Sequence, residues 1–198
     1  MDKERLQSQI DFCREIDKEK FIGRQTYKSD GVTKENDAEH AWHMAIMTLV
    51  LSEYANEKID ILKTISMLLI HDLVEIDAGD TYCYDEDGKK TQELREKACA
   101  DRLFNMLPKD QAQKFFELWR EFEEIKTPEA KFARTLDCLQ PLMLNDATDG
   151  KSWLEHKIKL SQVIKRNEHT PKGSLELWEY AYNNLIMPNV EKGLLEKD

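Results

Sequence analysis

The spacing of apolar residues predicts helices along most of this chain. In residues 5–18, Leu6, Ile10, Cys13 and Ile16 recur with the three- to four-residue period of an amphipathic helix. Comparable stretches follow, and we find no convincing alternation of the kind that marks a half-buried strand. These stretches cover about 38–54, 61–76, 94–106, 108–122, 128–143, 152 onward and 174–187. The pattern predicts an all-α fold of about seven or eight helices.

Flanking residues mark where several of these helices begin. Asp37 and Asp60 each precede a helical stretch, where a short carboxylate can accept hydrogen bonds from unpaired backbone N–H groups. Thr127, followed by a proline, is a third start signal. Residues 22–36 have the glycine, serine, aspartate and asparagine content of a loop. The helix after Asp37 is apolar nearly all round over residues 44–51, so we expect it to be central in the fold.

Length and charge narrow the class of protein. The chain has 198 residues, which predicts one domain over residues 1–198. Its net charge of −10 argues against a nucleic acid or an anionic membrane surface as the main partner. The N-terminus is charged and lacks the apolar region of a signal peptide, and the four cysteines form no Cys-x-x-Cys pair. We therefore expect a cytoplasmic protein with free thiols.

One stretch combines an apolar setting with residues that bind metals or move protons. Five apolar residues between 65 and 70 lead into His71, Asp72 and Glu75. On a helix Glu75 shares a face with the other two, because it follows them by three or four positions. Buried ionisable groups are costly unless they are paired or bound to a metal. A lone buried histidine or aspartate is more often a hydrogen-bonded core residue than a ligand, so this stretch alone is a weak signal.

Three sequence motifs extend this signal along the chain. They are the stretch from Glu35 to His40, the stretch from His71 to Thr81, and the stretch from Leu136 to Pro141. In this order they resemble the HD-domain superfamily of metal-dependent phosphohydrolases, and within it the branch of the 5′-deoxynucleotidases. The resemblance covers roughly residues 5–185. It implies a single HD-type helical domain with its motif-bearing core at about residues 20–147.

The resemblance also implies the residues of a site. Those that match the metal ligands of the superfamily are His40, His71, Asp72 and Asp137. Glu75 matches the acid that orients or deprotonates the attacking water, and Asp80 matches the carboxylate that contacts the nucleotide sugar. These assignments give each motif a chemical role.

Two basic residues are candidates for binding the phosphate of a substrate. Arg24 resembles the arginine of an Arg-Trp pair in the deoxynucleotidases, but Gln25 stands where those proteins have tryptophan. The loss of that tryptophan implies a weaker preference for 2′-deoxy sugars. Lys131 is a second candidate for neutralising the phosphate charge. His43 lies three residues after His40, and we expect it to support the site or pack beside it rather than to bind the metal.

These residues predict a metal-dependent phosphohydrolase, most simply a phosphomonoesterase that releases phosphate from nucleoside 5′-monophosphates. Two imidazoles and two carboxylates suit one divalent transition metal ion, and Mn²⁺, Fe²⁺, Co²⁺, Ni²⁺ and Zn²⁺ are all compatible. A non-catalytic metal- or nucleotide-binding regulatory module and a phosphodiesterase are the alternatives. The resemblance further implies a homodimer.

Overall fold

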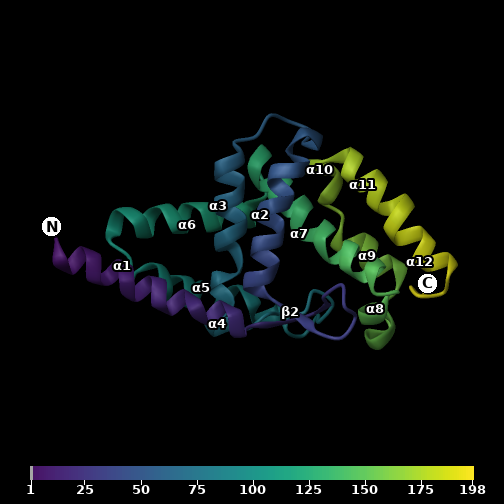
Figure 1. Ribbon diagram of the computed structural model, residues 1–198, viewed down its shortest axis with the longest axis horizontal. Coiled ribbons are helices and arrows are strands. Elements are labelled where there is room, and N and C mark those ends of the chain that lie inside the picture. The colour runs from purple at the N-terminus through teal and green to yellow at the C-terminus, as the bar shows by residue number, and fades with distance from the viewer. Residues whose placement is uncertain (1) are drawn as a thin grey trace.

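The computed structural model describes residues 2–198 and is mostly helical (Figure 1). The longer helices are α1 (Lys3–Glu15), α2 (Asp37–Leu51), α3 (Ile61–Ile70), α5 (Lys89–Phe104), α6 (Lys109–Glu124) and α7 (Pro128–Ala147). The shorter ones are α4 (Glu75–Ala78), α8 (Lys151–His156), α9 (Leu160–Arg166), α10 (Thr170–Gly173), α11 (Leu175–Ala181) and α12 (Met187–Glu191). The predicted all-α class is confirmed, although the last part of the chain is divided into more helices than expected. In residues 2–198 no helix is both long and apolar enough to cross a membrane.

The buried apolar residues form two clusters. One is built mainly on α2, α3, α7 and the helices after α7, and the other on α1, α5 and α6, which extend to the left in Figure 1. Met67 and Leu68 of α3 belong to the first cluster, whereas Ile70 and Leu73 belong to the second. The segment that carries the His-Asp pair therefore lies where the two clusters adjoin.

A small antiparallel hairpin precedes α2, in the stretch where we expected only a loop. Its strands are β1 (Gly23–Tyr27) and β2 (Lys34–Asn36). The carboxylate of Asp30 accepts two backbone N–H hydrogen bonds within the turn. Strands of five and three residues are too short to leave a visible alternation in the sequence. The hairpin matters for the site because it brings Arg24 beside the start of α2.

The first turn of α2 differs from the predicted one. Asn36 is the N-cap: its side chain accepts a hydrogen bond from the Glu39 N–H at 3.0 Å, and the Glu39 carboxylate accepts one from the Asn36 N–H at 3.1 Å. Asp37, predicted as the cap, is the first helical residue and is fully buried. The predicted caps Asp60 and Thr127 are confirmed.

The helix that we expected to run on to residue 76 ends at Ile70. The residues His71–Val74 form a 3₁₀ turn, and α4 follows as a single helical turn. Gly79 then has φ +74°, a conformation that strains any residue with a side chain, and it directs the chain into the loop over residues 80–88. Arg95 of α5 ties that loop down by donating hydrogen bonds to its two ends.

The helices that follow α7 pack back against it. At Gly173 of α10 the approach is so close that a Cβ atom would clash with the carbonyl oxygen of Lys131 and with the hydroxyl of Thr135, both on α7. The Thr135 hydroxyl also donates a hydrogen bond to the Thr170 carbonyl oxygen at 2.9 Å. Only glycine allows two backbones to approach this closely.

Only one face of helix α2 is buried in the fold, although we expected the whole helix to be central. It packs against α3 and α7 through buried residues that include Met44 and Met47. Its other face remains open, with Trp42 62% exposed, Leu49 58% exposed and Val50 63% exposed. The apolar residues of this helix therefore form two surfaces. One packs against α3 and α7, and the other is exposed to solvent in a single chain.

Candidate metal centre

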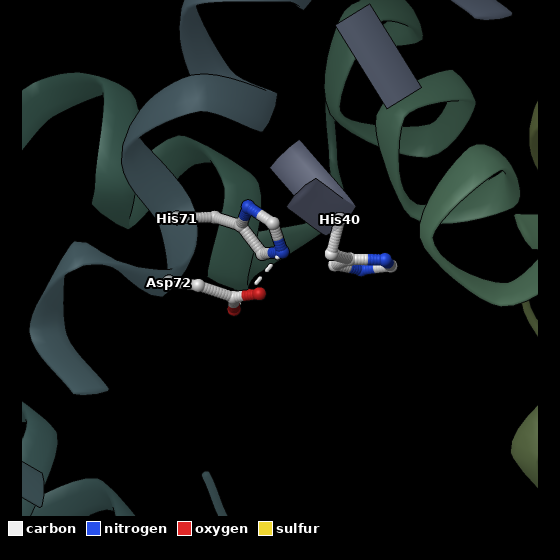
Figure 2. Close-up of side chains that lie close together, drawn as sticks. All are labelled: His40, His71 and Asp72. Carbon is white, nitrogen blue, oxygen red and sulfur yellow. Dashed lines mark ion pairs between the residues drawn. The ribbon is translucent and has the colours of Figure 1, made fainter. Parts of the chain in front are cut away.

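Three of the predicted ligands come together from two separate segments. His40 lies near the start of α2, and His71 and Asp72 open the 3₁₀ turn after α3. Each offers one ligand atom, and the three atoms lie within 4.8 Å of one another. Figure 2 shows the ring of His71 beside the carboxylate of Asp72, with His40 next to them on a different helix. All three side chains are buried, which the apolar run before His71 predicted for His71 and Asp72.

Asp137 of α7 completes the predicted set. Its Oδ1 lies 3.3 Å from His40 Nε2 and 4.0 Å from His71 Nε2. Asp72 Oδ1 lies 3.0 Å from the same nitrogen of His71. Two imidazole nitrogens and two carboxylate oxygens thus surround one small volume, a donor set that suits a divalent transition metal.

Hydrogen bonds on the far side of both imidazoles turn their Nε2 atoms toward the carboxylates of Asp72 and Asp137. His40 Nδ1 donates to Gln140 Oε1 at 2.9 Å, and His71 Nδ1 donates to the Leu68 carbonyl oxygen at 2.9 Å. Metal-binding histidines usually have such a partner, because it fixes the ring and keeps the proton on the other nitrogen. His71 Nε2 is buried, and the polar groups close to it in residues 2–198 are the carboxylates of Asp72 and Asp137, which are themselves proposed ligands. The residues present therefore fit a metal ion.

The electrostatics of the site also favour a cation. Burial alone would lower the pKa of His71, but the carboxylates of Asp72 and Asp137 raise it to about 9. Burial and the neighbouring carboxylates raise the pKa of Glu75. Both shifts have one cause, a surplus of negative charge in a place with little water, and a bound metal ion would offset that surplus.

The two predicted catalytic carboxylates line the same cavity as His71, Asp72 and Asp137. Glu75 is buried, and its Oε2 has no hydrogen-bond partner in the part of the chain described. Asp80 follows Gly79 and lines the cavity from the loop after α4. A water molecule or a substrate in the cavity can therefore meet both carboxylates.

Arg24 reaches the site, but its guanidinium already binds carboxylates of the protein. Its Nη1 donates to Asp72 Oδ2 at 3.0 Å and to Asp37 Oδ1 at 3.2 Å. Its Nε lies 3.7 Å from Glu35 Oε2. Since the other oxygen of Asp72 faces His71, Arg24 holds this carboxylate from the side opposite the imidazole.

Lys131 does not reach the cavity. Its Nζ lies 3.2 Å from Glu57 Oε1, and the residue is absent from the cavity wall. Lys131 precedes Asp137 by nearly two turns of α7, which separates their backbones by about 9 Å along the helix. The prediction that this lysine neutralises a bound phosphate therefore finds no support in its position.

Gln140 was not singled out by the sequence, yet it connects several site residues. Its Oε1 accepts the hydrogen bond from His40, and its Nε2 donates to Glu35 Oε1 at 2.6 Å. His43 Nδ1 lies 3.2 Å from the same amide nitrogen, so this histidine contacts Gln140 rather than the ligand atoms. The position of Gln140, one helical turn after Asp137, was the available signal.

Two arginines that the sequence also left unassigned hold Asp137. Its Oδ2 accepts hydrogen bonds from Arg134 Nη1 at 3.0 Å and from Arg166 Nη2 at 2.9 Å. Burial alone would raise the pKa of Asp137, but Arg166, His40 and Arg134 hold it well below its usual range. Arg134 precedes Asp137 by one turn of α7, whereas Arg166 comes from α9 and has no local signal in the sequence.

Known proteins resemble the chain over most of its length. A solved structure described as a predicted metal-dependent phosphohydrolase, from Magnetospirillum magnetotacticum MS-1, matches it with a TM-score of 0.92 and 46% identity, covering 96% of this chain and 95% of that one. The 5′-deoxynucleotidase HDDC2 of Homo sapiens is 28% identical over 152 residues, 76% of this chain and 71% of that protein. The HDDC2 protein of Dictyostelium discoideum is 28% identical over 166 residues, 80% and 87% of the two chains. The HD domain family model matches residues 16–178, so the chain belongs to the HD domain family.

Proposed function

We propose that this protein is a metal-dependent phosphohydrolase that releases phosphate from nucleoside 5′-monophosphates. The observation that carries the proposal is a buried set of two imidazole nitrogens and two carboxylate oxygens, three of whose residues line one cavity together with Glu75. Relatives named 5′-deoxynucleotidase and a structural neighbour described as a phosphohydrolase support the same reaction. A purely regulatory binding module is not favoured, since it has no need of a water-activating acid.

The side chains have separate roles in the proposed reaction. His40, His71, Asp72 and Asp137 would hold the metal ion, which when bound would polarise the phosphorus and neutralise phosphate charge. Glu75 accepts a hydrogen bond from the attacking water, orients it and takes its proton. The cavity wall supplies the cationic groups that face the remaining phosphate charge.

A panel of substrates tests the proposed function. We expect phosphate release from nucleoside 5′-monophosphates with at least one of Mn²⁺, Fe²⁺, Co²⁺, Ni²⁺ and Zn²⁺, and its loss when a chelator removes the ion. Ribo- and 2′-deoxynucleotides should differ only modestly, because Gln25 lines the cavity where the deoxynucleotidases carry tryptophan. Faster turnover of bis-p-nitrophenyl phosphate would favour a phosphodiesterase instead, and no release with any of the metals would contradict the proposal.

Asp80 is proposed to contact the sugar of the nucleotide. Asp80→Ala should then lower turnover of nucleotides much more than turnover of p-nitrophenyl phosphate, which has no sugar. The comparison of kcat/KM for the two substrates measures this difference directly. Equal losses on both substrates would place Asp80 at the metal or the phosphate.

We propose further that the protein is a homodimer and that its metal is one of Mn²⁺, Fe²⁺, Co²⁺, Ni²⁺ and Zn²⁺. The uncovered apolar face of α2, with Trp42, Leu49 and Val50, supports a second copy as its partner, because monomers rarely expose large contiguous apolar patches.

A further inference from the structure

Arg166, the last residue of α9, lines the cavity with most of its hydrogen-bond donors unused. A guanidinium has five N–H donors. Within residues 2–198 the Arg166 side chain donates one hydrogen bond, from Nη2 to Asp137 Oδ2 at 2.9 Å. The Arg166 side chain is 31% exposed, whereas that of Asp137 is 4% exposed. The remaining donors of Arg166 are therefore accessible from the cavity.

The two other arginines of the cavity wall are held more firmly by the protein. Arg24 is 12% exposed, and its Nη1 serves two carboxylates. Arg134 donates hydrogen bonds to Glu123 and to Asp137. Its guanidinium carbon also lies 4.2 Å from the centre of the Phe122 ring. Each of these two arginines donates two hydrogen bonds to protein carboxylates and is only 12% or 14% exposed, whereas Arg166 donates one and is 31% exposed.

Arg166 also lies next to the candidate metal centre. The Asp137 carboxylate accepts a hydrogen bond from Arg166 with one oxygen, and its other oxygen faces His40 Nε2 at 3.3 Å. The Asp137 carboxylate is thus the group that separates the free N–H donors of Arg166 from the volume that the four proposed ligands surround. A guanidinium binds two oxygens of one phosphate side by side, which matches an anion held at this distance.

We propose that Arg166 binds the phosphate group of the substrate, and that Arg24, which we first expected in this role, positions Asp72 instead. The inference rests on the proposed function, because it takes a phosphate monoester as the ligand. Inorganic phosphate, the product of the proposed reaction, should bind to the same arginine.

Calorimetric titration of the metal-loaded protein with inorganic phosphate tests the inference. Arg166→Ala should weaken phosphate binding by about 10- to 100-fold, the range expected for hydrogen bonds to a charged group. Arg166→Lys should weaken it less, since lysine keeps the charge but not the paired donors. Lys165→Ala is the matched control: this neighbour on α9 is exposed, and its removal should leave phosphate binding unchanged. Metal content is measured for every variant.

Three outcomes would overturn the assignment of Arg166. They are no phosphate binding by the unaltered protein, unchanged binding in Arg166→Ala, and a loss of phosphate binding in step with loss of the metal. The last would make Arg166 a positioning residue for Asp137.

Nucleotide turnover is measured separately from phosphate binding. If phosphate binds through Arg166 but no nucleotide is hydrolysed, the proposed function fails and the assignment of Arg166 stands. If nucleotides are hydrolysed while Arg166→Ala leaves both KM and phosphate affinity unchanged, the assignment fails alone.

Discussion

Replacing Glu75 with glutamine is expected to lower phosphate release by about 10²–10⁴-fold, the usual contribution of general-base assistance. Glutamine keeps the shape of the side chain but cannot accept a proton, and the four proposed metal ligands are other side chains. Metal content and fold should therefore survive in Glu75→Gln. Steady-state turnover, metal analysis and circular dichroism of the same preparation measure the three quantities.

Glu19→Gln is the matched control for this experiment. Glu19 is also a buried glutamate, whose pKa is raised to about 7 by burial and by the negative charge of Asp72, but it is absent from the cavity wall. Its replacement should leave turnover unchanged. If Glu75→Gln instead loses the metal, Glu75 is a ligand, and if it keeps full turnover with the metal in place, another group activates the water. Asp80 would be the first residue to test.

His71→Ala is expected to reduce bound metal from about one ion per chain to nearly none. The variant loses one ligand and leaves Asp72 and Asp137 as buried carboxylates without their imidazole and cation, which also destabilises the fold. Added metal should raise the Tm of the unaltered protein, because the ion binds the folded state, and this increase should disappear in the variant.

Metal analysis and thermal unfolding test this expectation against His169→Ala. That histidine is partly exposed beside Glu168, away from the ligand atoms, so its loss should change neither quantity. An unaltered metal content in His71→Ala would remove His71 from the ligand set.

Local patterns were enough to predict much of this fold. The helical class follows from apolar spacing, and the caps at Asp60 and Thr127 follow from short polar side chains placed before helical stretches. The structure also gathers the four proposed ligands, which rested on motif resemblance, around one small volume. These signals are local or belong to a sequence motif, so they can be recognised in a single sequence.

Features that depend on distant contacts were harder to predict. The hairpin is held by pairing between strands too short to show a period, and Asp37 could be read equally as a cap or as a buried partner of Arg24. Lys131 lies on the helix of a ligand but points elsewhere. Arg166 reaches Asp137 from another helix, and no periodicity along the chain encodes such a contact.

The close approach at Gly173 has a consequence for evolution. Gly173 has no chemical role, yet it sets how near α10 can come to α7, which carries Asp137. Arg166 ends α9, the helix just before α10, so the packing that Gly173 allows lies close in the chain to the residue that holds Asp137. Position 173 should therefore stay glycine in relatives that keep this helix packing, whether or not they keep the arginine, because the clash is with α7 itself.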